Sequence, residues 1–320
     1  MQETIPDDRG LLEALIGDGR PLLIFTGRCL VLSGGFALFL SATGHFLPHD
    51  VQFLGITADE LCAIAQCRIV HFMFHDRVSF GGALISIGAL YMWLAEFPLR
   101  RGEAWAWWLF VVTGVVGFGS FLAYLSYGYL DTWHGAGTLL LLPFFIAGLI
   151  RSYVELPKPA SLQTLFKPSA PLSLKSSLGI GRACLLATAL GMVAGGLTIM
   201  TVGMTRVFVP QDLTFMGLAA ADLHAINPRL VPLIAHDRAG FGGAIASCGV
   251  AVFFCVWCAR PRKSLWQVLC VAGVVGFSTA IGIHPVVGYL SFSHLAPAIA
   301  GALVFLVGLL LCFKPMHSTK

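Results

Sequence analysis

The tripeptide His-Asp-Arg occurs twice in the chain, at residues 75–77 and 236–238, which are 161 positions apart. An imidazole can bind a metal ion or transfer a proton, a carboxylate can orient that imidazole, and a guanidinium can bind an anion. In both places a phenylalanine, two glycines and an apolar stretch follow. The duplicated tripeptide is therefore the first place where we expect a functional site.

Other histidines could complete such a site. His134 and His294 each precede a later apolar stretch, and His71 lies four residues before His75, on the same face of a helix. His284 precedes Pro285, and we expect it at a helix end exposed to the membrane interface. The metal candidates are His71, His75, His134, His236 and His294, and the candidates for binding another ligand are Asp76, Arg77, Asp237, Arg238 and His284.

The residue types suit a metal ion such as zinc, iron or copper, or a haem iron. If each tripeptide starts a helix, the helix dipole disfavours a proton on the histidine, and metals bind the neutral imidazole. A structural alternative needs no ligand: the aspartate would cap the helix and the arginine would extend to lipid headgroups.

Composition determines what kind of scaffold carries these residues. Hydrophobic residues make up 57% of the chain and charged residues 11%, too few to cover the surface of a soluble domain. Eight apolar segments are long enough to cross a membrane. They lie near residues 29–46, 78–95, 104–125, 134–150, 183–202, 239–259, 265–283 and 295–313. We predict an all-α integral membrane protein with eight transmembrane helices.

An internal repeat relates the two halves of the chain. Besides the tripeptide, Gly-Val-Val-Gly-Phe recurs at 114–118 and 273–277, and Gly-Tyr-Leu recurs at 128–130 and 288–290. Each half holds four predicted spans, and an even number returns the chain to its starting side. We therefore expect two tandem four-helix units of the same orientation, at 29–150 and 183–313.

Three segments lie outside these units: an N-terminal segment at 1–28, a proline-containing polar linker at 151–182, and a tail at 314–320. With both termini inside, fifteen Lys and Arg residues lie on the cytoplasmic side and five outside, as the positive-inside rule prefers. Nine of the ten histidines then lie in the outer half. The acidic start of the chain does not resemble a cleavable signal peptide, so we expect a bacterial-type inner membrane.

Paired histidines follow from this topology. Spans two and four of each unit enter from the outside, so their first residues share a depth. We predict that His75 lies close to His134, and His236 close to His294, at the outer helix ends. The nine cysteines are not expected to form a disulfide framework, and most lie within predicted spans, where a thiol acts as a small apolar side chain.

The leading functional hypothesis is a membrane protein with an extracytoplasmic site of His, Asp and Arg. This site would bind a metal, a haem or an anionic lipid-like ligand for redox or hydrolytic chemistry. Two alternatives remain: a permease or channel for a small neutral solute, and a non-catalytic accessory subunit. A nucleic-acid partner is not expected, because no basic stripe is present. The oligomeric state is left open.

Topology can be tested with reporter fusions at Ser161 in the linker and at Asp131 near the fourth span. We expect Ser161 to report the cytoplasm and Asp131 the outside, because basic residues concentrate at the linker. The same side for both positions would contradict the predicted number of spans.

Overall fold

The computed structural model describes residues 10–122, 128–129, 132–158 and 160–318. The protein is 82% helical with no strands among the described residues, which confirms the all-α prediction. The long helices are α2 (Arg20–Ala42), α5 (Arg68–Glu96), α6 (Ala104–Leu122), α7 (Thr132–Val154), α8 (Ser177–Thr205), α11 (Leu230–Cys258), α12 (Lys263–Val287) and α13 (Phe292–Ser318).

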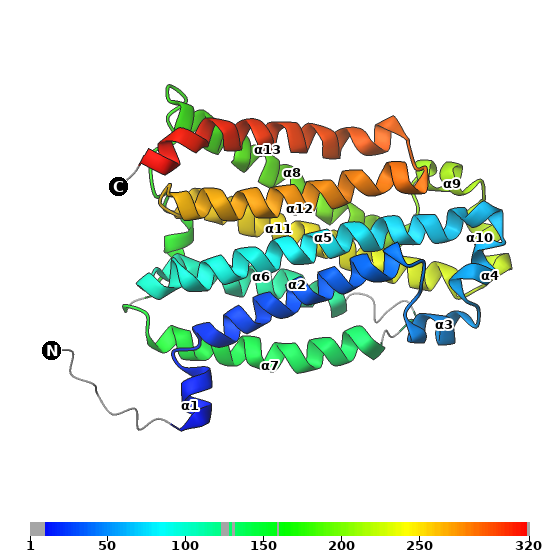
Figure 1. Ribbon diagram of the computed structural model, residues 1–320, viewed down its shortest axis with the longest axis horizontal. Coiled ribbons are helices and arrows are strands. Elements are labelled where there is room, and N and C mark those ends of the chain that lie inside the picture. Colours follow the sequence, from blue (N-terminus) through cyan, green and yellow to red (C-terminus); the bar gives the residue numbers. More distant parts are fainter. Residues whose placement is uncertain (1–9, 123–127, 130–131, 159, 319–320) are drawn as a thin grey trace.

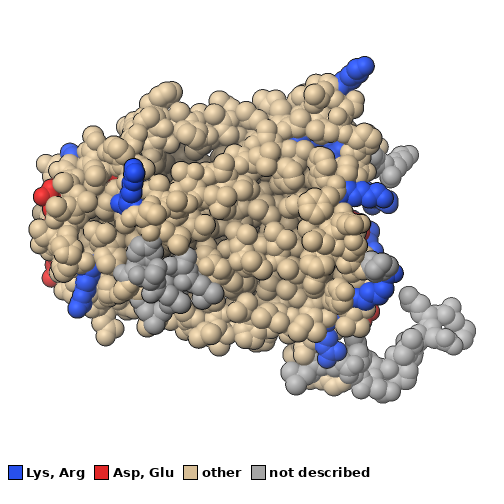
Figure 2. Space-filling model, turned by 180° about the vertical axis from the view of Figure 1, so that it is seen from behind, with Lys and Arg blue, Asp and Glu red and all other residues tan. Residues whose placement is uncertain are grey.

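Seven of these helices are long and apolar enough to cross a membrane, which confirms a polytopic membrane protein. The predicted span at 104–125 falls on α6, whose apolar part is shorter and adjoins residues outside the described part of the chain. An eighth transmembrane helix therefore stays a prediction. The face drawn in Figure 2 has a broad band without charged side chains between its two ends, as expected for a surface against lipid.

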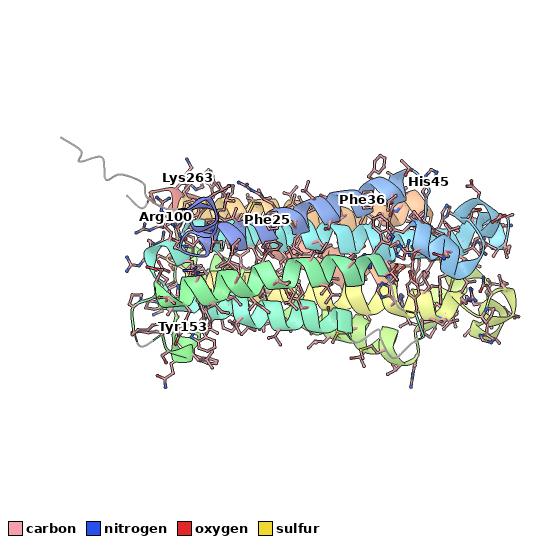
Figure 3. The ribbon with its side chains drawn as sticks, turned by 90° about the horizontal axis from the view of Figure 1, so that it is seen from below. Phe25, Phe36, His45, Arg100, Tyr153 and Lys263 are labelled. Carbon is pink, nitrogen blue, oxygen red and sulfur yellow. A yellow bond between two sulfur atoms is a disulfide. The ribbon has the colours of Figure 1, made fainter. Side chains whose placement is uncertain are left out.

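The two ends of the molecule differ in what they carry. Short helices α3 (Pro48–Leu54), α4 (Ala58–Cys62), α9 (Pro210–Met216) and α10 (Ala220–Ile226) lie at one end, opposite α1 (Leu11–Ile16) and the end of α13 (Figure 1). Figure 3 places Arg100 and Lys263 at the end that holds α1, and His45 near the other. We call these the basic end and the histidine end.

Helices α5 and α11 form the centre of the molecule. In each of them, 72% of the residues in an apolar stretch of 18 residues are buried, against 17–28% in the other five candidate spans. Helix α5 packs on α2 and α12, and α11 packs on α8 and α6. Each central helix thus contacts partners from both halves of the chain, and the halves interlock.

Glycines let these helices approach closely. Gly34 of α2 faces the backbone of Gly81 on α5, and Gly196 of α8 faces Gly242 on α11. Between the halves, Ser86 Oγ donates to the carbonyl of Ala272 (2.9 Å). Small residues that follow each tripeptide, such as Gly81 and Gly242, therefore lie at helix contacts.

Both central helices start earlier than the apolar pattern predicts. Helix α5 begins at Arg68 and α11 at Leu230, so each tripeptide lies inside a continuous helix. The expectation that His75 and His236 start their helices is wrong, and with it the helix-dipole argument and the role of the aspartates as helix caps. The predicted spans at 78–95 and 239–259 leave out these first helical turns, because charged residues interrupt the apolar sequence there.

The short helices at the histidine end are fixed locally. Thr57 and Glu60 form a capping box at the start of α4, with Glu60 Oε2 accepting from Thr57 N at 2.7 Å. A disulfide joins Cys62 and Cys67 between α4 and α5. The sequence did not indicate this bond, because a single short-range pair gives no pattern of spacings.

The residues that link the two halves are ordered against α11. A 3₁₀ helix, η4, spans Leu162–Phe166. The buried Arg182 donates to the carbonyl oxygens of Val256 (3.1 Å) and Ala170 (2.9 Å), so it satisfies a carbonyl at the end of α11. The predicted linker therefore carries part of the packing at the basic end.

Two adjacent glycines of α2 test the close approach. An added methyl group at Gly34 would collide with α5, whereas the same position at Gly35 has open space. We expect Gly34→Ala to lower the free energy of unfolding by about 1–3 kcal/mol through overpacking. Gly35→Ala should leave it unchanged or raise it by up to about 1 kcal/mol. Thermal unfolding in detergent measures both, and equal stabilities would contradict this packing.

Candidate functional site

Three histidines meet at the histidine end of the helices. His75 lies on α5, His284 near the end of α12 and His294 at the start of α13. His75 Nε2 lies 3.0 Å from His284 Nε2, and one ring nitrogen from each of the three residues falls within 4.8 Å of the others. His75 and His284 are each only 3% exposed. We call these three residues the triad.

The predicted pairs are therefore wrong. His75 contacts His284 and His294 of the other half rather than His134, and His134 Nδ1 lies 3.4 Å from His236 Nε2. The reason is the interlocked packing: α5 lies against α12, so its histidine meets the other half of the chain. Topology gave these residues a common depth, but it could not decide which helices are neighbours.

Asp76 fixes the orientation of His75. Asp76 Oδ1 lies 3.0 Å from His75 Nδ1, and Asp76 is 1% exposed. An ionised carboxylate only accepts hydrogen bonds, so Nδ1 carries the proton and Nε2 presents a lone pair toward His284. A carboxylate that orients a histidine in this way is a common feature of metal sites.

Arg238 connects Asp76 to a second carboxylate. Its Nε lies 3.2 Å from Asp76 Oδ2 and its Nη1 lies 2.7 Å from Asp212 Oδ2. Nη1 also donates to the carbonyl of Val207 (2.7 Å), and the guanidinium lies over the ring of Phe72. These partners hold the buried charge inside the protein, so the alternative that Arg238 extends to lipid headgroups is wrong.

A matching network surrounds Arg77. Its Nε donates to Asp237 Oδ2 (2.8 Å), and its Nη1 lies 2.7 Å from Asp50 Oδ2. Its guanidinium lies over Phe46, so Arg77 is also held within the protein rather than at headgroups. Each arginine therefore pairs with the aspartate of the other tripeptide, and Arg77 and Arg238 cross-link α5 and α11.

Two tyrosines complete the networks. Tyr129 donates to Asp50, and Tyr289 donates to Asp212 Oδ1 (2.7 Å). Burial alone would raise the pKa of Asp50, but Arg77, the Tyr129 hydroxyl and His49 outweigh it and hold the pKa below its usual value. Burial and the nearby Asp212 raise the pKa of Tyr289, so its hydroxyl keeps its proton.

Charge is unbalanced in both networks. Each contains one guanidinium and two carboxylates, and all four carboxylates are at most 9% exposed in their side chains. With neutral imidazoles, each network carries one net negative charge. A buried charge without a counter-charge is costly. A bound metal ion or a protonated histidine beside each network would compensate this charge, as would a proton on one of its carboxylates.

A second group of histidines lies next to the Arg77 network. His134 and His236 are joined by His49 of α3, whose ring centre lies 6.5 Å from that of His134. This group is looser than the triad. His71 lies on α5 one turn before His75 and is half-buried, and among the described residues it does not belong to a three-ligand cluster.

Several site residues were missed or misplaced by the sequence analysis. His284 is buried in the triad, not exposed at the interface as expected. Asp50, Asp212 and His49 were overlooked, although Asp50 and Asp212 stand at the same offset before the matching Phe-Leu-Gly and Phe-Met-Gly. The repeated Gly-Tyr-Leu contains Tyr129 and Tyr289, but the sequence alone does not show which group a tyrosine hydroxyl contacts.

A cavity of about 730 Å³ extends from the triad along the long helices. At the histidine end it is lined by His75, Asp76, Arg238, His284 and His294. Further along, its walls come from α5, α8, α11, α12 and α13 and are mostly apolar, with a few serine and threonine residues. The triad thus lies where a polar site meets an apolar chamber.

Comparisons with protein-family models, with curated proteins and with solved structures give no match to this chain. The function must therefore be argued from the site. Fold and site together define a polytopic membrane protein with a buried cluster of histidine, aspartate and arginine residues at one end of its helices.

Removing Arg238 tests the charge network. Arg238→Gln leaves Asp76 and Asp212 buried without their guanidinium, and we expect a loss of about 3–5 kcal/mol in the free energy of unfolding. The matched control is Arg206→Gln, because Arg206 is exposed. Thermal unfolding in detergent measures both. Equal stability of the two variants would show that the network contributes little.

Proposed function

We propose that this protein is an integral membrane metalloprotein whose triad of His75, His284 and His294 binds one transition-metal ion. The observation that carries the proposal is the convergence of three imidazole nitrogens within 4.8 Å of one another, from three different helices. A histidine with a purely structural role in a membrane protein packs against its neighbours or caps a helix without needing other histidines nearby. Three that converge from three different helices are typical of ligands.

The dimensions fit a metal ion. Two nitrogens bound to a tetrahedral zinc at about 2.1 Å each lie about 3.4 Å apart. The separation of 3.0 Å between His75 Nε2 and His284 Nε2 is close to this value. A haem bound between these two nitrogens would need its porphyrin ring to fit between them, and they are too close for a ring. The geometry therefore favours a bare ion over haem.

The electrostatics also support a cation. The network of Arg238, Asp76 and Asp212 carries one excess negative charge beside the triad. A divalent ion would compensate it where water is scarce. Three protein ligands leave a fourth position for water or substrate, which is the arrangement of catalytic rather than structural zinc sites. Polarisation of that ligand would supply hydrolytic chemistry, and iron or copper would supply redox chemistry.

The second histidine group extends the proposal. His134 and His236 stay proposed ligands of a second ion beside Asp237 and Arg77, because their network carries the same excess charge. The paired arrangement of arginine, two aspartates and a tyrosine in each network supports the proposed duplication of units 29–150 and 183–313. It also supports their common orientation.

We place the histidine end outside the cytoplasm of a bacterial inner membrane, with both termini cytoplasmic. The basic end carries the excess of Lys and Arg, as the cytoplasmic side of membrane proteins does. The Cys62–Cys67 disulfide lies at the histidine end, and disulfides persist in oxidising compartments outside the cytoplasm. In this orientation the triad receives its metal from the extracytoplasmic side.

Metal content tests the proposal. Purified protein equilibrated with zinc and then desalted should retain metal, and His284→Ala should lose about one equivalent per chain because a triad ligand is gone. The control is His224→Ala, since His224 is an exposed histidine on α10. Elemental analysis gives the stoichiometry. A metal-free protein that carries a neutral solute into liposomes would refute the proposal and favour a permease.

A further inference from the structure

The cavity beside the triad has the shape of a site for a long molecule. Along α13 its lining extends from His294 to Phe305, eleven residues, which is about 17 Å of helix. This length exceeds half of the about 30 Å hydrocarbon thickness of a bilayer. Its volume of about 730 Å³ lies within the range of about 300–1,000 Å³ typical of ligand pockets.

The cavity is accessible from the surface that lipid would cover. Its lining includes Ala187 and Gly191 of α8 and Pro297 and Ala300 of α13, all of which are exposed. Figure 2 shows a hollow near the upper edge of the molecule, on the side where α8 and α13 lie. A ligand dissolved in the bilayer could therefore enter sideways, without passing through water.

The polar end of the cavity determines the headgroup. Arg238 and its two aspartates leave one negative charge, so a divalent metal on the triad gives the site one positive charge. A headgroup with a single negative charge and oxygen donors would neutralise it and occupy the fourth metal position. Dianionic phosphate headgroups would overcompensate. The few hydroxyl groups deeper in the lining, those of Ser79, Ser86, Thr188 and Thr198, already donate to backbone carbonyls.

We propose that this cavity binds a long-chain carboxylic acid, with its carboxylate on the triad metal and its hydrocarbon tail between α8, α11, α12 and α13. This inference rests on the proposed metal site for the headgroup. It rests on the cavity alone for the tail, so the two parts can be tested separately.

Gly195 offers a variant that fills the chamber without disturbing the metal ligands. Gly195 lines the cavity on α8, and a Cβ atom added there meets no atom within 4 Å. Gly195→Leu would therefore place its side chain in the space of the tail. Gly35→Leu is the matched control, because Gly35 also has open space but lies on α2, away from the cavity.

The experiment measures palmitate binding to the zinc-loaded protein in detergent by displacement of a fluorescent fatty acid, with hexadecanol and acetate as comparison ligands. We expect palmitate to bind at least about tenfold more tightly than hexadecanol or acetate, and Gly195→Leu to weaken it at least about tenfold. Gly35→Leu should bind like the unmodified protein, and both variants should keep their zinc.

Equal affinities for palmitate and hexadecanol would overturn the assignment of the headgroup. Unchanged palmitate binding in Gly195→Leu would overturn the assignment of the cavity. Failure of the metal proposal is recognised independently, because the unmodified protein would then retain no zinc. If palmitate binding in that protein were still lost in Gly195→Leu, the tail site would stand and the metal-bound headgroup would fall.

Discussion

The exchange of ion pairs between α5 and α11 is the interaction on which the rest of the structure depends. Arg77 pairs with Asp237 and Arg238 pairs with Asp76, so each tripeptide is neutralised by the other. These charges lie inside helices that otherwise carry apolar and small residues, where an unpaired charge would be costly. The exchange therefore fixes the register of the two central helices, and with it the depth and neighbours of His75 and His236.

The position of the histidines follows from this central pair. Because α5 packs against α12, His75 meets His284 of the other half of the chain. His236 of α11 likewise lies beside His134, at the start of α7 in the first half. Asp76 has two roles, since it accepts from both His75 and Arg238. The Asp76 carboxylate thus links the ion pairs between α5 and α11 to the proposed metal site. A substitution that shifts one of them would therefore also shift the other.

Sequence patterns predicted the class of protein and a cluster of His, Asp and Arg around the duplicated tripeptide, because both depend on composition or local spacing. The predictions failed for residues whose surroundings depend on contacts between helices that are distant in sequence. His284 was expected at an interface because Pro285 follows it, yet it faces His75. Asp50 and Asp212 stand in short helices that no periodicity marks, and the charged turns before residue 78 concealed the true start of α5.

The central claim is that His75, His284 and His294 share one metal ion. X-ray absorption at the metal edge of the zinc-loaded protein tests it most directly, because imidazole ligands give a characteristic scattering pattern. The account predicts a shell of nitrogen and oxygen ligands at about 2.0–2.1 Å with imidazole scattering. That scattering should weaken in His284→Ala, whereas a spectrum without imidazole ligands, or one identical in the variant, would contradict the claim.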